Sequence, residues 1–321
     1  MGVPTATFQT YSQIGIREDL SDIIYDISPM DCYFFNNASR LKATAVRHEW
    51  QTDALAAPAA NDWIEGEDFS GGAITATTRL ANICQISRKD VVVSRTSNKV
   101  NTAGRKEELA YQMVRKGKEL KRDIEFCCVR NYPATLGAAT SGRTSASVES
   151  WIHSAAHVKG TSQTTASTTA PVSGLQSTVG VDGTAEAFTE TELKSALQQA
   201  WSTGGEVDVI LLGPTLKNKL DAFTGIATRF RNVAAGQQAD IVGAADVYVS
   251  SYGSHKVVLS RYMRASVVLC LDMEMWGIAW LDPINMVDIA KSGDSEKRML
   301  VGEWCVVAKS PLANAKLTNM T

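Results

Sequence analysis

The stretch GRKEELAYQMVRKGKELKRDIE, residues 104–125, decides the fold of this chain. Apolar residues recur in it at helical spacing, and charged residues fill the rest of the helix circumference. We therefore predict one long helix from about Ala103 to Asn131, which at about 1.5 Å per residue would span on the order of 40 Å. Pro133 marks its end. Its apolar stripe consists of Leu109, Met113, Leu120, Ile124 and Cys127 or Cys128.

The residues before this helix predict a short amphipathic piece and then extended chain. REDLSDIIYDI, residues 17–27, has apolar residues at helical spacing and is stopped by Ser28-Pro29. TAVRHEWQTD, residues 44–53, and LANICQISRKDVVVS, residues 80–94, instead read as strands. The Ala- and Gly-rich stretch between them cannot build a core, so it reads as a protruding loop. Paired strands would make a long ribbon, which needs support from a neighbouring copy.

The residues after the long helix predict a flexible excursion followed by a mixed α/β region. Residues 134–187 are dominated by Gly, Ser, Thr and Ala, as in TSQTTASTTAPVSG. Thr189 and Glu192 then form a capping box for a helix that Gly204-Gly205 ends. A buried strand (VDVILLG), a helix after Pro214 and two strands around a tight turn near Tyr252-Gly253 follow. The last strand, in EKRMLVGEWCVVAKSP, must pair with a strand already made.

Composition limits the function classes. The chain has 321 residues, is 44% hydrophobic and 21% charged, and carries a net charge of −2, which argues against a surface that grips nucleic acid throughout. No apolar stretch reaches the roughly 20 residues of a bilayer span, and MGVPTATFQTYSQ does not resemble a secretory signal. We expect a protein made in the cytoplasm. The scattered cysteines, for which we predict neither disulfides nor zinc, are Cys32, Cys84, Cys127, Cys128, Cys270 and Cys305.

Candidate reactive residues do not combine into a site. His153 and His157 share the spacing of a metal-binding helix, with Glu149 before them, but no third ligand is apparent. His48 falls on the same strand side as Trp50 and is expected to be an ordinary packed or hydrogen-bonded histidine. The carboxylates of Asp272, Glu274 and Asp282, near Trp276 and Trp280, could suggest a glycosidase, yet strand alternation explains them equally well. We therefore predict no enzymatic activity, no cofactor and no metal.

The middle of the long helix is basic, through Arg115, Lys116, Lys118, Lys121 and Arg122. These residues either form a solvated face, partly neutralised by pairs such as Arg115 with Glu119 and Lys121 with Glu125, or contact a phosphate backbone. Such a contact needs only non-specific charge.

Three motifs taken together resemble a known family. HEWQTD at 48–53, QISRK at 85–89 and the helix at 104–125 are similar to the major head proteins of tailed bacteriophages, in the same order and best between 14 and 135. The resemblance implies the α+β Hong Kong 97 fold: an amino-terminal arm, an extended β-ribbon loop, a peripheral domain on a spine helix, and a mixed α/β axial domain. The loop residues Trp63, Glu65, Glu67 and Asp68 are then expected to contact neighbouring subunits.

The resemblance also divides the chain into seven segments. They are the arm with the first ribbon strand (1–53), the loop and return strand (54–102), the spine helix (103–135), a Gly/Ser/Thr-rich insertion (136–187), a second peripheral helix (188–205), the axial domain (206–285), and a return strand to the peripheral domain (286–321).

The function implied is a structural one. A major capsid protein assembles as hexamers and pentamers into an icosahedral head around double-stranded DNA. Its partners would be further copies, possible scaffolding, portal or decoration proteins, and weakly bound DNA, and its place would be the virion, assembled in the bacterial cytoplasm. The alternatives are an encapsulin-like compartment, which has less need of the long ribbon and arm, and a soluble α/β enzyme, which would form only small oligomers.

Overall fold

The computed structural model describes residues 31–68, 71, 74–100, 107–153, 158–159, 171, 173–223, 246–291 and 293–321. Three predicted features lie outside these residues: the helix within 17–27 with its Ser28-Pro29 stop, the core of the Ser/Thr-rich stretch, and the AAGQQAD loop at 234–240.

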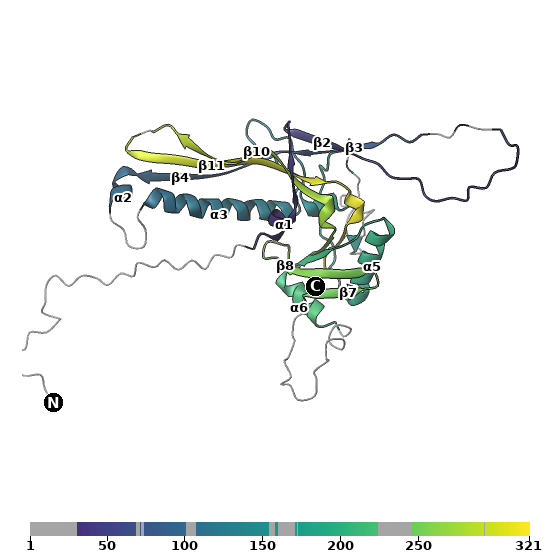
Figure 1. Cartoon of the computed structure of the whole chain (residues 1–321). Coiled ribbons are helices and arrows are strands. Elements are labelled where there is room, and N and C mark those ends of the chain that lie inside the picture. Colours follow the sequence, from purple (N-terminus) through teal and green to yellow (C-terminus); the bar gives the residue numbers. More distant parts are fainter. Residues whose placement is uncertain are drawn as a thin grey trace, which may run out of the picture.

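The elongated part of the molecule is a four-stranded sheet with one long helix lying along it (Figure 1). The strand order is β1 (Ser39–Lys42), β10 (Trp276–Ile289), β11 (Ser295–Ala308) and β4 (Gln85–Ser94). β1 is parallel to β10, and the other pairs are antiparallel. The helix is α3 (Glu108–Val129). Short helices α1 (Tyr33–Asn37) and α2 (Arg95–Lys99) lie near its two ends.

The apolar stripe predicted for α3 is confirmed. Leu109, Leu120, Ile124 and Cys128 are buried, and Gly117 lies next to the Leu300 side chain of β11. Every second residue of β4 faces this helix. Lys89 forms an ion pair with Asp123 of α3 at 2.6 Å, and Val91 and Val93 pack around Leu109. The helix and the sheet thus stabilise each other by burying one face each.

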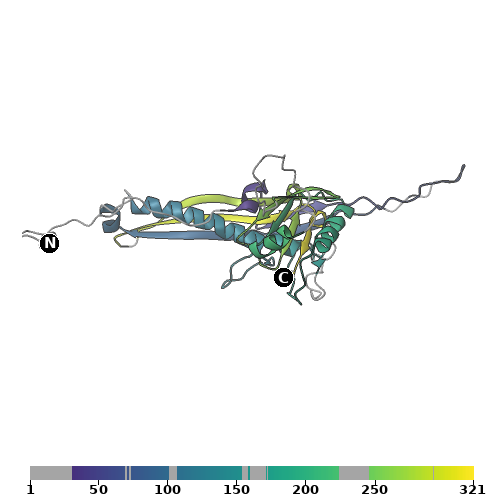
Figure 2. The same cartoon turned by 90° about the horizontal axis from the view of Figure 1, so that it is seen from below.

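A second sheet lies beside one end of the elongated part (Figure 2). It has six strands in the order β5 (Val158–Lys159), β12 (Ala315–Leu317), β9 (Val268–Leu271), β6 (Val209–Leu212), β8 (Gly253–Leu259) and β7 (Val247–Ser250). Helices α5 (Glu190–Ser202) and α6 (Pro214–Asp221) share an apolar core with it. The short 3-10 helices Met273–Met275 and Pro311–Ala313 complete the chain.

The predicted helix and turn signals of this region are confirmed. The Thr189 hydroxyl accepts a hydrogen bond from the Glu192 amide at 3.3 Å, which caps α5. Gly204 follows the helix with a φ of +88°, a conformation that favours glycine. β7 and β8 pair through a turn that brings Ser250 opposite Gly253. None of the helices in the described ranges combines the length and apolar content that a membrane crossing needs.

The predicted long ribbon is wrong in its pairing. Only β2 (Arg47–Thr52) and β3 (Thr78–Ile83) pair with each other, six residues on each side. β4 leaves the ribbon after Cys84 and pairs along its whole length with β11. The reason is burial. One face of β4 packs against α3, and the backbone groups along one edge of β4 form hydrogen bonds with the central strand β11.

Two further expectations need correction. The first part of the Gly/Ser/Thr-rich segment predicted as an excursion packs into the core, since Ala146 and α4 (Val148–Trp151) are fully or almost fully buried. The segment predicted as 206–285 also spans both sheets: β10 starts at Trp276 inside the four-stranded sheet and runs past 285. The chain then returns to the six-stranded sheet as β12, which the sequence did not predict.

Candidate assembly surfaces

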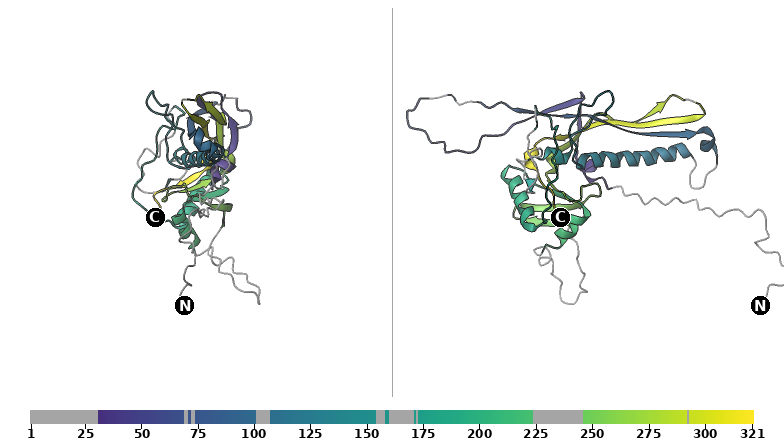
Figure 3. Two further views of the ribbon diagram at one scale, coloured as in Figure 1. Left: turned by 90° about the vertical axis from the view of Figure 1, so that its left-hand side faces the viewer. Right: turned by 180° about the vertical axis from the view of Figure 1, so that it is seen from behind.

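The loop between β2 and β3 extends away from the rest of the molecule, at the end opposite to α2 (Figure 3). Its described residues make no helix or strand between Asp53 and Thr77. Leu55 is 100% exposed and Ile74 is 97% exposed, although both are large apolar residues. A monomer gains nothing from such exposure, so the loop reads as a surface prepared for another molecule.

Near the middle of the loop, a small turn presents the residues that the sequence singled out. The Glu67 amide donates to the Ile64 carbonyl at 3.0 Å, and Gly66 supplies the φ of +84° that the turn requires. Trp63 is 64% exposed, and its indole donates to the side chain of the nearby Asn61 at 2.7 Å. The carboxylates of Glu65, Glu67 and Asp68 are exposed beside it.

The base of the loop is held firmly to the body. The indole of Trp50 donates to the Ala308 carbonyl at 2.9 Å and its ring lies 5.5 Å from that of Trp151. The His48 ring lies 5.9 Å from that of Trp50 and is tilted by 35° to it, and the two residues share one strand face. Burial lowers the pKa of His48. The ribbon therefore leaves the body at a fixed position.

A buried carboxylate anchors the chain where residues 31–37 meet the spine helix. Glu125 of α3 accepts hydrogen bonds from the amides of Phe34 and Phe35, at 3.1 and 2.7 Å. These amides lie in the first turn of α1, which has no side-chain cap of its own. Burial raises the pKa of Glu125 to about 7, against the effect of the two backbone hydrogen bonds. The sequence did not predict this role and instead paired Glu125 with Lys121.

The basic residues of α3 do not form one surface. Arg115, Lys118 and Lys121 are exposed, whereas Lys116 pairs with Glu119 at 2.7 Å on the side of the helix that faces β4. Arg122 is half-buried. The predicted pairs of Arg115 with Glu119 and of Lys121 with Glu125 are thus replaced. The Arg115 guanidinium instead lies over the Tyr111 ring.

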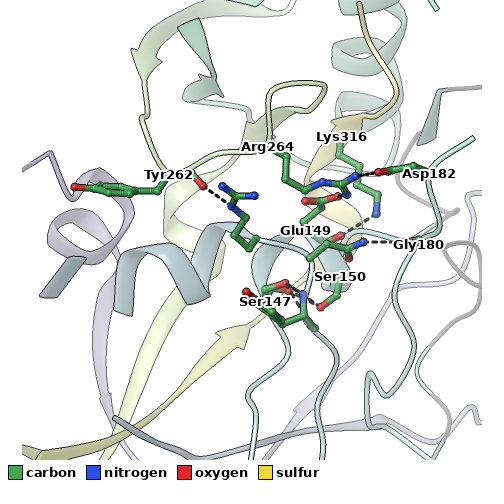
Figure 4. A network of polar contacts seen from close by, with 11 residues as sticks. Ser147, Glu149, Ser150, Gly180, Asp182, Tyr262, Arg264 and Lys316 are labelled. Atoms are coloured by element: carbon green, nitrogen blue, oxygen red, sulfur yellow. Dashed lines mark hydrogen bonds and ion pairs between the residues drawn. The ribbon is translucent and has the colours of Figure 1, made fainter. Parts of the chain in front are cut away.

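A buried charged network joins the two parts of the molecule (Figure 4). Arg264 forms ion pairs with Glu149 at 2.7 Å and with Asp182. The Lys316 ammonium donates to the Glu149 carbonyl at 2.8 Å. Burial lowers the pKa of Lys316 to about 8, although the nearby Glu149 carboxylate opposes the shift. Burial also raises the pKa of Glu149, and the Arg264 guanidinium opposes that shift. Glu149 and Arg264 therefore form a buried ion pair in which each charge neutralises the other.

The structure shows the surroundings of the described residues that were weighed as catalytic or metal-binding. Glu149 is engaged with Arg264, His153 is buried, and His157 lies outside the described residues. Asp272 caps a 3-10 turn by accepting from the Glu274 amide at 3.1 Å, and Asp282 accepts from the Asn285 side chain. In the parts of the chain that the structure covers, His, Cys, Asp and Glu form no group suited to a metal ion.

Two polar residues of the core were missed from the sequence. Asn82 is fully buried and donates to Ser145, to the Ala146 carbonyl and to the Val306 carbonyl at 2.6 Å. Lys316 is almost fully buried in a short strand. The sequence around neither residue differs from that around an exposed polar residue. Their burial is therefore visible only from the contacts in the folded structure.

An exposed loop on a short ribbon, a spine helix along an elongated sheet and a second sheet at one end define a phage capsid protein of the Hong Kong 97 type. The capsid asymmetric unit of cyanophage A-1(L) has this fold, with a TM-score of 0.72, 13% identity and 98% of both chains covered. The phage G structure of major capsid and decoration proteins is also similar, with a TM-score of 0.53, 12% identity and full coverage of both chains.

The chain belongs to the SU10 major capsid protein family, whose model matches residues 3–321. A relative with 26% identity over 351 residues, covering 99% of this chain and 97% of its own, is the major capsid protein of Escherichia phage Phieco32. The protein is thus a major capsid protein of a tailed phage, which decides against the encapsulin-like alternative.

Proposed function

We propose that this protein assembles as hexamers and pentamers into a closed icosahedral shell around double-stranded DNA, and that its role is structural and not enzymatic. The shell would be assembled in the cytoplasm of the bacterial host and would become part of the virion. The observation that carries the proposal is the extended loop, whose described residues expose large apolar side chains and reach away from the body (Figure 1).

The loop is proposed to bind a neighbouring subunit through its apolar residues. Burying a side chain of this size is worth about 1.5 to 3 kcal/mol before the cost of ordering the loop is subtracted. One such contact would be weak. In a closed shell each subunit is held by several neighbours at once, so that weak contacts add up to a stable assembly. The four residues concerned are Leu55, Trp63, Ile64 and Ile74.

The acidic residues beside the apolar ones are proposed to set where the loop can dock. Glu65, Glu67 and Asp68 place three carboxylates next to Trp63 and Ile64. A neighbouring surface of the same sign would repel them, whereas one that carries Lys or Arg would orient the loop. The apolar residues would then supply the binding affinity, and the charges would fix the position and orientation of the loop on its neighbour.

DNA contact is proposed to be weak and confined to exposed basic residues of α3. Arg115, Lys118 and Lys121 are exposed, and Arg122 is partly so, while Lys116 is engaged with Glu119. With a net charge of −2 for the whole chain, a shell of many copies would not hold a polyanion strongly. Binding would be non-specific and would weaken as the salt concentration rises. Scaffolding, portal or decoration proteins are proposed as further partners.

The test is to shorten the loop and to remove its apolar tip. Deleting residues between Ala56 and Thr77 should leave a folded subunit, because the described part of this segment contributes nothing to the apolar core. Trp63→Ala combined with Ile64→Ser should act in the same way, and Asp62→Asn, at an exposed residue next to them, is the matched single-site control. Circular dichroism would report folding, and size-exclusion chromatography with negative-stain microscopy would report shells.

We expect the parent and the control to form capsomers or particles of megadalton size, and both loop variants to remain small. Normal closed shells from the deletion variant would refute the role of the loop. If the parent itself ran only as a small oligomer under every assembly condition, the proposed function as a whole would fail and the enzyme alternative would return.

A further inference from the structure

Two buried cysteines from distant parts of the sequence lie opposite each other in the four-stranded sheet. Cys84 joins β3 to β4, and Cys305 belongs to the central strand β11. The antiparallel register pairs Gln85 with Trp304, so one further residue places Cys84 opposite Cys305. Both are fully buried within one small apolar cluster, which they share with Ala43, Ala279 and Val307.

The side chains of this pair also point to the same face of the sheet. Gln85 reaches Cys127 of α3, and the Trp304 indole donates to Ser87, so these two residues face the helix. Alternation then directs Cys84 and Cys305 to the opposite face. Residues directly opposed in antiparallel strands have Cα atoms about 4.5 or 5.5 Å apart, and a disulfide accommodates about 4.4 to 6.8 Å. The usual spacing of directly opposed strand residues therefore falls within the range that a disulfide needs.

The thiols already interact. A hydrogen bond between them lowers the pKa of Cys84 and raises that of Cys305, which makes Cys84 the better nucleophile of the two. The Cys84 thiol also contacts the Ala45 carbonyl at 3.6 Å. By contrast, Cys270 is buried alone in the six-stranded sheet, where burial raises its pKa to about 12.

We propose that Cys84 and Cys305 are a latent disulfide, reduced while the protein is made in the cytoplasm and closed by a peroxide once the protein is outside the cell. The Cys84 thiolate would attack one oxygen of hydrogen peroxide and become a sulfenic acid, with hydroxide leaving. The Cys305 thiol would then attack the Cys84 sulfur and release water. The two thiols lose two electrons, and one peroxide becomes two waters.

The bond would fasten the base of the loop to the central strand of the sheet. Cys84 directly follows the ribbon strand β3, and the chain between the two cysteines includes α3 and the whole six-stranded sheet except β12. A link that closes so long a segment restricts the unfolded chain strongly. This inference goes beyond the proposed shell function and does not depend on it, because the bond forms within one subunit.

The test is to oxidise the purified full-length protein with dilute hydrogen peroxide and to label the remaining thiols with N-ethylmaleimide in denaturant. The reduced chain has six cysteines, so intact mass should show two fewer adducts after oxidation. Trypsin should release the peptide 80–88 joined to the peptide 299–309, each carrying one cysteine. The thermal unfolding midpoint should rise by about 5 °C or more, and dithiothreitol should reverse the rise.

Cys270→Ala is the matched control, since it removes another fully buried thiol and should leave the linked peptides unchanged. Cys84→Ala should abolish both the link and the rise in midpoint. The proposal is overturned if peroxide leaves every thiol free, if it stops at sulfinic acid on Cys84, or if the two peptides become linked only in denaturant. A link that forms without any rise in midpoint would overturn its stabilising role.

Discussion

Replacing Ile124 with aspartate should abolish the soluble subunit. Ile124 is completely buried in the largest apolar cluster of the protein, beneath α1 and against the four-stranded sheet. Truncating a buried isoleucine to alanine costs about 2 to 5 kcal/mol, and an unpaired buried carboxylate adds several more. The adjacent Glu125 is itself a buried acid that binds the Phe34 and Phe35 amides, so it cannot neutralise the new carboxylate. The sum approaches or exceeds a typical stability of about 5 to 15 kcal/mol.

The assay is a graded series measured by soluble yield and by denaturant unfolding. Ile124→Val should cost only about 0.5 to 1.5 kcal/mol. Arg115→Ala, on the exposed face of the same helix, should stay within about 0.5 kcal/mol of the parent. Leu120→Asp should behave like Ile124→Asp, since Leu120 is buried in the same cluster. Equal yield and equal unfolding midpoints across the series would refute the assignment of this stripe to the core.

Two further predictions concern charge. The pKa of Glu125, about 7 in the folded protein, lies above its ordinary value of 4.5, so the folded state binds the extra proton and stability should fall as the pH rises from about 4.5 to 7. The slope should approach about 1.4 kcal/mol per pH unit. Glu125→Gln should flatten it in urea titrations, and an unchanged slope would contradict this account. Lys118→Glu with Lys121→Glu should leave folding intact, because both side chains are exposed, and should weaken genome retention at low salt only. If heads of this variant hold DNA like the parent at low salt, this face of α3 does not contact the DNA.

The elements with strong periodicity were predictable from the sequence, whereas their partners were not. The spacing of Leu109, Leu120 and Ile124 predicted the spine helix, and the Thr189 capping box predicted the start of α5. β4 was also predicted as a strand, but its pairing with β11 joins residues more than 200 positions apart. Register between such distant strands depends on which faces are buried together, and alternation within one strand does not supply that information.

Composition misled the prediction for the first part of the Gly/Ser/Thr-rich segment. Small polar residues usually indicate an exposed loop. Here the hydroxyl of Ser145 and the carbonyl of Ala146 satisfy the buried Asn82 side chain, and small size lets this segment pass close to β11. The same limit applies to the candidate sites. Exposed Trp63 could be selected from the sequence because a polar loop does not need it, but buried Glu125 could not be distinguished from the solvated charges of its helix.

The distribution of polar groups indicates how one chain can be both a stable subunit and an incomplete one. Inside the body, the buried polar residues are joined across distant segments: Asn82 ties the ribbon to β11, Glu125 ties residues 31–37 to α3, and Arg264 ties α4 to the second sheet. Such networks hold one arrangement because each broken bond leaves a buried group unsatisfied. The described residues of the loop have no comparable network and expose apolar side chains instead. A rigid body can thus carry a loop that takes its final conformation only when it binds a neighbouring subunit. Subunits in hexamers and in pentamers have different neighbours, so the loop would have to adapt to each position.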